Sequence, residues 1–227
     1  NLSAHGYTSK NRKFQRTVAV PAEKIEDDQY SIYSPLFEEM GRAAASHPDE
    51  LVFEMIGRGF VDQAYDKVAF FGDHKVGRAT VKNYQPGAKP PWYLLDCSRA
   101  LRPFIFQSRR PPRFVRKDDP NKSDRVFETD EFRYGVDCRS NAGFGFWQMG
   151  FGSRAELTRD NLRAAFTSMA DQQDEKGKKL GIKATHLLVP PGLEFAARDL
   201  VLASVNAAGA TNTDFNLVKV VSSPYLG

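Results

Sequence analysis

The chain has 227 residues, of which 41% are hydrophobic and 26% are charged, and its formal net charge is +4. This composition is ordinary for a globular protein with one large domain or two modest ones, and such a chain needs no metal or disulfide to support its core. No apolar run approaches the roughly 20 residues that span a bilayer, and no signal-peptide pattern opens the sequence, so no membrane segment is expected.

The N-terminal part begins with a polar arm over residues 2–13 and a predicted strand over 14–20. Because the first residue is Asn and not Met, we expect the N-terminal part of the protein to be missing. A helix is predicted from Ser34, as N-cap, with Pro35 in its first turn. Its apolar stripe is interrupted at Pro48 and ends at Gly57 or Gly59, which fits one long kinked helix or two helices in tandem.

The middle of the chain alternates predicted strands with turns and loops. Loops are expected at 77–91 and 109–120, the second because it holds three prolines, and a turn at 72–74 with a hydrogen bond between Asp73 and His74. Two antiparallel strands are predicted to join near Asn141-Ala142-Gly143. The β segments expected in this region are 65–71, 92–95, 104–106, 126–134 and 135–151.

The last third of the chain alternates helices and strands. Thr158 is a predicted cap of a helix, a polar turn follows at 174–177, and a strand is expected at 185–189. A helix that begins at Pro190-Pro191 and a closing strand at 217–221 complete the pattern. The order of strand, helix and strand indicates an α+β or α/β fold whose sheet core forms late in the chain.

Motifs for catalysis and for metal binding are lacking in the sequence. There is no nucleophile elbow, phosphate loop or dinucleotide fingerprint, and the four histidines have no partner at ligand spacing. Cys97 and Cys138 lie far apart and are predicted to be two buried, reduced thiols. We therefore predict no catalytic residue, no metal ligand and no cofactor.

A basic segment is the strongest candidate for a binding site. Three interpretations remain open for it: contact with phosphates and bases, pairing with the acidic stretch 118–131 of a neighbouring copy, or a plain solvated face. Phe104, Phe106 and Phe114 are interleaved with its charges. The candidate residues are Arg99, Arg102, Arg109, Arg110, Arg113, Arg116 and Lys117.

Longer motifs occur in one order over nearly the whole chain. The longest is Ile32-Tyr33-Ser34-Pro35-Leu36-Phe37-Glu38-Glu39-Met40-Gly41-Arg42-Ala43-Ala44, followed by His47-Pro48-Asp49-Glu50-Leu51-Val52. Others are Trp92-Tyr93-Leu94-Leu95-Asp96-Cys97-Ser98-Arg99, Asn141-Ala142-Gly143-Phe144-Gly145-Phe146-Trp147-Gln148-Met149 and Leu180-Gly181-Ile182-Lys183-Ala184-Thr185-His186-Leu187-Leu188-Val189-Pro190. Together they resemble the Mu-like major head subunit family.

This resemblance implies an α+β phage major capsid protein of the Hong Kong phage (HK ninety-seven) fold. It implies an extended β-hairpin loop and return strand in residues 1–33, with its N-terminal part truncated, and a spine helix of the peripheral domain in 34–60. Residues 61–157 would be a mixed β region shared between the peripheral and axial domains, and 158–227 the axial α/β domain.

The implied function is that of a structural subunit, not an enzyme, in the virion capsid. The resemblance implies self-assembly through pentamers and hexamers in the bacterial host cytoplasm, non-specific contact with packaged double-stranded DNA, and scaffold, portal and decoration proteins as partners. A stand-alone basic nucleic-acid-binding protein is the alternative, and an enzyme of unrecognised type is a second rival. Steep salt dependence of DNA binding by the monomer would indicate the former.

Overall fold

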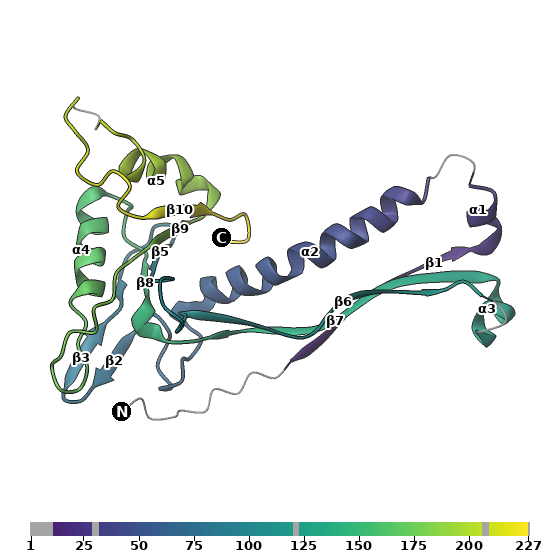
Figure 1. Ribbon diagram of the computed structural model, residues 1–227, viewed down its shortest axis with the longest axis horizontal. Helices are drawn as coiled ribbons and strands as arrows, with labels where there is room; N and C mark the ends of the chain where they lie inside the picture. Colours follow the sequence, from purple (N-terminus) through teal and green to yellow (C-terminus); the bar gives the residue numbers. More distant parts are fainter. Residues whose placement is uncertain (1–10, 29–31, 120–122, 206–208, 227) are drawn as a thin grey trace. The chain divides into compact units, whose positions relative to one another are not determined.

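The computed structural model describes residues 11–28, 32–119, 123–205 and 209–226. The chain divides into two compact units. The first is formed by residues 52–105 and 143–227, and the second by residues 9–51 and 106–142, in each case over their described part. The first unit holds a sheet of five strands and a two-stranded hairpin, whereas the second is built on a sheet of three long strands (Figure 1).

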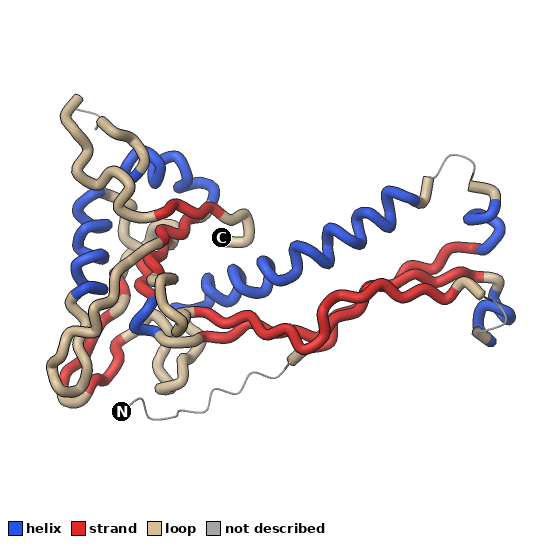
Figure 2. Tube along the Cα trace, viewed as in Figure 1, coloured by secondary structure: helices blue, strands red, loops and turns tan. Residues whose placement is uncertain are grey.

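The second unit is a long, thin sheet. β1 (Arg12–Pro21), β7 (Glu131–Phe144) and β6 (Phe104–Lys117) lie in the order β1-β7-β6. β1 and β7 pair antiparallel over ten residues, from Arg12 opposite Ser140 to Pro21 opposite Glu131. β6 runs out and β7 returns beside it (Figure 2). The described residues of this unit hold few buried side chains, so the sheet has little core of its own.

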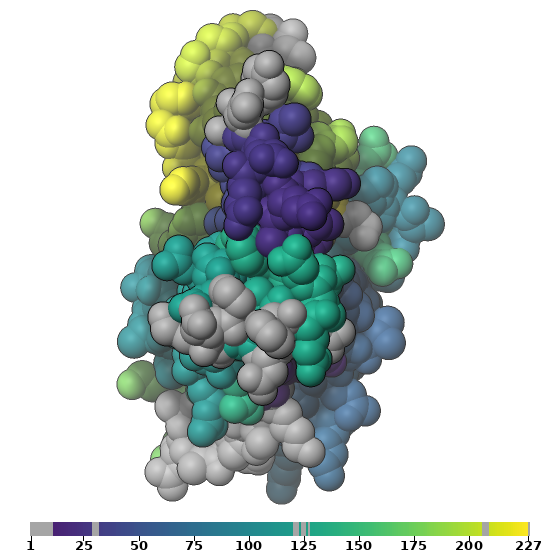
Figure 3. Space-filling view, turned by 90° about the vertical axis from the view of Figure 1, so that its right-hand side faces the viewer, coloured from purple at the N-terminus to yellow at the C-terminus, as the bar shows by residue number. Residues whose placement is uncertain are grey.

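Two short helices lie at one end of this sheet. α1 (Ala22–Glu26) follows β1, and α3 (Asp124–Thr129) connects β6 to β7. They lie side by side in Figure 3, where the N–H of Ala22 donates a hydrogen bond to the carbonyl of Asp130 at 2.9 Å. Asp130 ends α3 in a left-handed conformation, with φ of 49°, which lets the chain turn directly into β7.

A single helix, α2 (Ser34–Gly57), passes through Pro48 without a break. This resolves the two alternatives in favour of one long helix, and Ser34 is its first helical residue instead of its cap. Within the second unit, α2 packs on the sheet through Phe37, whose ring centroid lies 4.7 Å from that of Tyr134 and 6.4 Å from that of Phe114. Further along, His47 contacts Phe14 at 4.1 Å between centroids.

The sheet of the first unit has the order β10-β9-β5-β8-β4. The central strand β5 (Trp92–Leu95) is antiparallel to both β9 (His186–Val189) and β8 (Gly150–Ser153). The two outer pairs, β10 (Lys219–Ser222) with β9 and β4 (Tyr84–Gln85) with β8, are parallel. All four residues of β5 are buried, so both faces of the sheet are covered.

The two faces are covered by different side chains. Trp92 and Leu94 belong to the main apolar cluster, together with side chains of α4 (Arg159–Ala170) and α5 (Glu194–Val201). Tyr93 points to the opposite face because neighbouring residues of a strand alternate. There it meets Phe71, with ring centroids 5.3 Å apart, in an aromatic layer that also includes Phe60, Phe70, Phe104 and Phe144.

A buried amide fixes the chain around that aromatic layer. The Nδ2 of Asn83 donates to the carbonyls of Phe70, Trp147 and Gly150 at 2.8, 3.2 and 3.2 Å. Its Oδ1 accepts a hydrogen bond from the N–H of Gly72 at 2.9 Å. Asn83 is fully buried, so it satisfies main-chain groups that water cannot reach.

Several predicted elements are confirmed. β1 covers the strand that was predicted over residues 14–20. β5, β9 and β10 lie at or close to the predicted strands 92–95, 185–189 and 217–221. The Oγ1 of Thr158 accepts a hydrogen bond from the N–H of Asn161 at 3.3 Å, which confirms it as the cap of α4. The last predicted helix is a 3-10 turn, Pro191–Leu193, that continues into α5.

The predicted structure of the middle region is wrong in several places. Residues 65–71 form turns instead of a strand, whereas the predicted turn and loop at 72–91 contain β2 (Asp73–Val76), β3 (Ala79–Lys82) and β4. The segment 126–134 includes α3, and β7 runs straight through Asn141 to Gly143, where a hairpin turn was predicted. The predicted loop 109–120 is mostly strand β6.

The error at β6 has a physical reason. Pro111 and Pro112 lack the backbone N–H that a strand uses to pair, which favours a loop when the sequence is considered alone. β6 is, however, an edge strand in the order β1-β7-β6. Neighbouring residues of a strand direct their N–H groups to opposite sides, so one of the two prolines faces the open edge and the other omits a single bond to β7. The position of a strand within its sheet is a tertiary property that the local sequence does not show.

Candidate interface along strand β6

The predicted basic residues fall into two groups. Arg109, Arg110, Arg113, Arg116 and Lys117 lie on β6 in the second unit. Arg99 and Arg102 lie in the first unit, on the segment between β5 and β6. Only the five residues on β6 form a continuous run.

One acidic residue pairs with two of the charges on β6. The Oδ1 of Asp137 on β7 accepts from the Nε of Arg113 at 2.6 Å, and its Oδ2 accepts from the Nη2 of Arg110 at 2.7 Å. The hydrogen bond from Arg113 is the largest influence that lowers the pKa of Asp137, and the charges of Arg110, Arg113 and Lys13 act in the same direction. The same hydrogen bond raises the pKa of Arg113. Asp137 therefore stays ionised at neutral pH.

The remaining charges on the strand are less compensated. Arg116 has a carboxylate oxygen of Asp118 at 3.7 Å from its Nη1. Within the described part of the chain, Arg109 and Lys117 have no ion pair. Two carboxylates therefore stand near five cationic side chains, and β6 keeps an excess of positive charge.

Apolar side chains are exposed on the same strand. Phe114 is 55% exposed, and Ile105, Phe106 and Val115 are exposed as well. A strand that shows both guanidinium groups and large apolar side chains to solvent combines the two features of a macromolecular interface: charge for orientation and apolar area for affinity. The alternative of a purely solvated charged face does not explain the exposed aromatic and aliphatic residues.

Arg99 and Arg102 serve the structure of their own unit. Arg99 donates from Nη2 to the carbonyl of Leu180 at 3.0 Å and to that of Gly181. Arg102 donates to the carbonyl of Cys97. The bonds of Arg99 tie the segment after β5 to the loop before β9, and the bond of Arg102 lies within that segment, so both guanidinium groups are already partly engaged.

Asp96 completes this tie. Burial by itself would raise the pKa of Asp96, but hydrogen bonds from the hydroxyl and N–H of Ser98 and from the N–H of Lys183, with the charge of Arg99, lower it. These hydrogen bonds to Asp96 hold the turn that follows β5 in place.

Sequence reasoning found the basic residues but missed their partner. Pairing with the acidic stretch 118–131 of a neighbouring copy was one of three interpretations and stays a prediction. Within the chain, Asp137, six residues beyond that stretch, accepts both arginine bonds. Likewise His74 bonds to Asp66, at 2.5 Å from Nδ1 to Oδ2, and not to its neighbour Asp73. The signal for both would have been the pairing of distant segments, which a single sequence does not give.

Other reactive groups are dispersed. Among the described residues, no three His, Cys, Asp or Glu side chains are grouped as metal ligands would be. Cys138 is buried, as predicted, and Cys97 is only half-buried, and both are free thiols. No helix in the described ranges is both long and apolar enough to cross a membrane.

Comparison with solved structures defines the class of protein. The chain is similar to a structure described as the bacteriophage JBD30 capsid, with a TM-score of 0.86 and 29% identity over 96% of this chain and 76% of the other. It is also similar to the JBD30 procapsid, with a TM-score of 0.81 and 39% identity over 95% of this chain and 76% of the other. The fold is thus the α+β fold of phage capsid proteins.

Sequence relatives give the family. The chain is 40% identical to the major capsid protein of Escherichia phage Mu, over 99% of this chain and 78% of that protein. It is 40% identical to the Mu-like prophage FluMu major head subunit of Haemophilus influenzae, over 94% and 73% of the two chains. A family model described as Mu-like prophage major head subunit gpT matches residues 1–226. The chain belongs to this family, and it is a shell-forming structural subunit of a phage head.

Proposed function

We propose that copies of this subunit join as pentamers and hexamers into a closed shell around double-stranded DNA. The observation that carries the proposal is the surface of the second unit, where all but two residues of the 14-residue strand β6 are exposed. A long exposed strand with apolar side chains is a liability for an isolated protein but suits one that is covered by its neighbours. Repeated heterologous contacts of this kind close into rings of subunits.

The proposal assigns parts of the chain to the domains of the capsid fold. Residues 34–60 would be the spine helix of the peripheral domain, which is supported by the unbroken helix α2. Residues 158–227 would be the axial domain, and 61–157 the mixed β region. Residues 1–33 would be the extended loop and return strand, of which 1–10 and 29–31 lie outside the described residues.

The proposal places the basic residues of β6 toward DNA or toward a neighbouring subunit. Arg113 and Arg116 have side chains 59% and 70% exposed, so both reach solvent. Guanidinium groups at the surface bind phosphates without reading sequence, and release of counterions makes such binding depend on salt. Arg109 and Lys117 are the best suited because no carboxylate of the described chain neutralises them.

The subunit would act as a structural component and not as an enzyme. The proposal includes assembly in the bacterial host cytoplasm with scaffold, portal and decoration proteins. A further similar structure, 30% identical with a TM-score of 0.85 over 98% of this chain and 77% of the other, is described as a JBD30 capsid decorated with minor capsid protein trimers. That description supports a decoration partner for the relative, and by analogy for this chain.

Electron microscopy of the full-length head subunit expressed alone tests self-assembly. We expect sheets, tubes or shells, and a protein that stays monomeric at high concentration would contradict the proposal. For the DNA contact, the test is genome retention in particles that carry Arg109→Glu and Lys117→Glu. We expect retention to fall, whereas Lys176→Glu, an exposed change in the first unit, serves as the control. Equal retention in both variants would reject the DNA-facing role of β6.

A further inference from the structure

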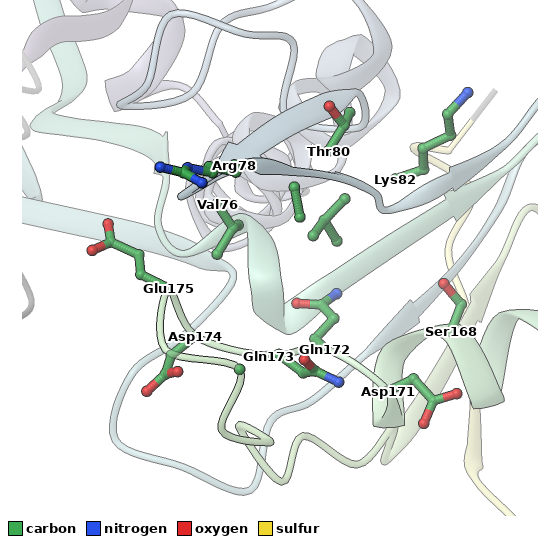
Figure 4. A pocket seen from close by; sticks show the side chains of 13 residues that line it. Val76, Arg78, Thr80, Lys82, Ser168, Asp171, Gln172, Gln173, Asp174 and Glu175 are labelled. Carbon is green, nitrogen blue, oxygen red and sulfur yellow. The ribbon is translucent and has the colours of Figure 1, made fainter.

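A groove borders the β2–β3 hairpin of the first unit. It lies between that hairpin and the loop that follows α4, and its volume is about 650 Å³ (Figure 4). All four residues of β3 line it, whereas β2 contributes only Val76 among the described lining residues. The opposite wall includes Ser168, Gln172 and Gln173. The groove therefore follows the side of β3 that faces away from β2.

Strand pairing leaves this side of β3 open. The two strands form a sheet by themselves, with Thr80 opposite Lys75 and Lys82 opposite Asp73. The N–H of Asn83 bonds to the carbonyl of Gly72. Hydrogen-bonded and non-hydrogen-bonded pairs alternate along an antiparallel ladder, so the main-chain groups of Thr80 and Lys82 point away from β2. Two N–H and two carbonyl groups are thus directed to the groove side.

A buried amide without partners lies on the opposite wall. Gln172 is 4% exposed, and within the described chain neither its Oε1 nor its Nε2 has a hydrogen-bond partner. Its side chain points from the end of α4 toward the hairpin (Figure 4). Buried polar groups are normally paired, so this amide has both its donor and its acceptor available to a group that enters the groove. Because Gln172 has no bond to lose, its amide can rotate toward such a group without breaking one.

The hydrogen-bonding groups on the two walls are complementary to one kind of ligand. An open strand edge offers alternating donors and acceptors, and a glutamine amide offers one group of each kind, as a peptide bond does. An extended polypeptide main chain matches both walls at once, and strand addition to an exposed edge is an established mode of peptide recognition. Four residues of β3 correspond to a segment about 13 Å long at about 3.3 Å per residue.

We propose that an extended segment of a second copy of this chain occupies the groove and adds to β3 as a third strand. This inference rests on the proposed function, because a shell subunit has copies of itself on its edges. Charge supports this occupant: the groove is lined by Arg78 and Lys82 on one wall and by three carboxylates on the other, of which Asp171 is bonded to Lys179 at 2.5 Å. A lining that carries both signs suits a polypeptide segment, which also carries both, better than the uniformly negative backbone of DNA.

Amide hydrogen exchange in the soluble full-length subunit and in assembled particles is the direct test. We expect the N–H groups of Thr80 and Lys82 to exchange fast in the subunit and at least about tenfold more slowly in particles. The N–H of Lys75, on the outer edge of β2, is the control and stays fast. Protection of Thr80 and Lys82 already in the soluble subunit, or none in particles, overturns the inference.

The outcomes also separate this inference from the proposed function. Failure of the subunit to form any particle contradicts both. Particles that form while Thr80 and Lys82 remain unprotected contradict the strand addition alone. Protection that appears only after a different phage protein is added rules out a second copy as the occupant.

A substitution at Gln172 gives an independent readout. Gln172→Met keeps the size of the side chain and removes the unpaired amide, so we expect the thermal midpoint of the soluble subunit to stay equal or rise. Assembly loses an amide contact, and we expect the concentration needed for assembly to rise at least about threefold. Gln63→Met, at an exposed position of the same unit outside the groove, is the control. A lower midpoint with unchanged assembly would show that Gln172 has only an internal role and would reject the proposal.

Discussion

The carboxylate of Asp137 lies 2.6 Å from the Nε of Arg113 and so joins the two strands of the β6–β7 hairpin. The same carboxylate accepts a bond from Arg110 at 2.7 Å. In a unit with few buried side chains, a pair of charged hydrogen bonds between strands contributes to register as well as to charge balance. The negative charge of Asp137 also offsets one of the positive charges on β6, the strand that we propose as an interface.

Replacing Asp137 by Asn tests this pair through pH. The folded-state pKa of Asp137 is lowered, so its contribution to stability is complete above the unfolded pKa of about 3.9 and is lost as pH falls through the lower folded pKa. We expect the wild-type protein to have a slightly higher thermal midpoint than Asp137→Asn at neutral pH. The gap between the two should close below about pH 4, and a gap that does not change with pH would contradict the pairing.

The pairing of Asp137 also shows how far a sequence reading reaches. β5 is predictable because Trp92–Leu95 is a continuous apolar run, and α4 because Thr158 is a typical cap. The long β6–β7 hairpin is not, because the tandem prolines suggest a loop, and the edge position of β6, which limits their cost to one bond with β7, is not visible in the sequence. The basic residues of the candidate interface stand out by composition, whereas their partner depends on strand pairing over 24 residues of chain.

Asn83 is expected to be critical for the first unit. Asn83→Ala leaves the buried carbonyl of Gly150 and the N–H of Gly72 without their partner and removes one bond each from the carbonyls of Phe70 and Trp147. We expect a loss of about 3 kcal/mol in the free energy of unfolding. Urea denaturation of the two proteins measures it. The matched control is Asn161→Ala, whose side chain bonds to the carbonyl of Glu156 at an exposed site and should cost much less. Equal losses at the two positions would mean that Asn83 is not the hub that its bonds indicate.

Phe37 connects α2 to the sheet of the second unit. Its ring lies against Tyr134 and near Phe114, and Phe37→Ala removes the aromatic contact between helix and strands. We expect a loss of about 2 kcal/mol, less than for a fully buried ring because Phe37 is half-buried. Faster proteolysis of β6 and β7 would accompany it. Glu38→Ala, at the exposed next position, should leave both measurements unchanged, and a similar effect there would point to helix propensity in place of packing.

Gly145 is predicted to tolerate no side chain. A Cβ at this position would lie 2.2 Å from the main-chain carbonyl oxygen of Arg102. That oxygen accepts a hydrogen bond from the N–H of Phe146, and the N–H of Gly145 bonds to the next carbonyl, that of Pro103. Backbone cannot move aside as a flexible side chain can, so Gly145→Ala should destabilise the protein by about 3 kcal/mol or more. A lower thermal midpoint is the measurement. At Gly192 a Cβ would meet nothing within 4 Å, so Gly192→Ala is the control and should be nearly neutral.

Pro48 lies inside α2, where it withholds one helical hydrogen bond from the carbonyl four residues earlier, that of Ala44. Pro48→Ala restores the donor, although the unfolded chain then gains conformational freedom that offsets part of the benefit. We expect a net rise of about 1–2 kcal/mol in the free energy of unfolding. Pro35→Ala is the matched control, because in the first turn of α2 a missing N–H has no partner to lose, and its effect should stay within about 0.5 kcal/mol. A drop in stability for Pro48→Ala would show instead that packing of the proline ring outweighs the missing bond.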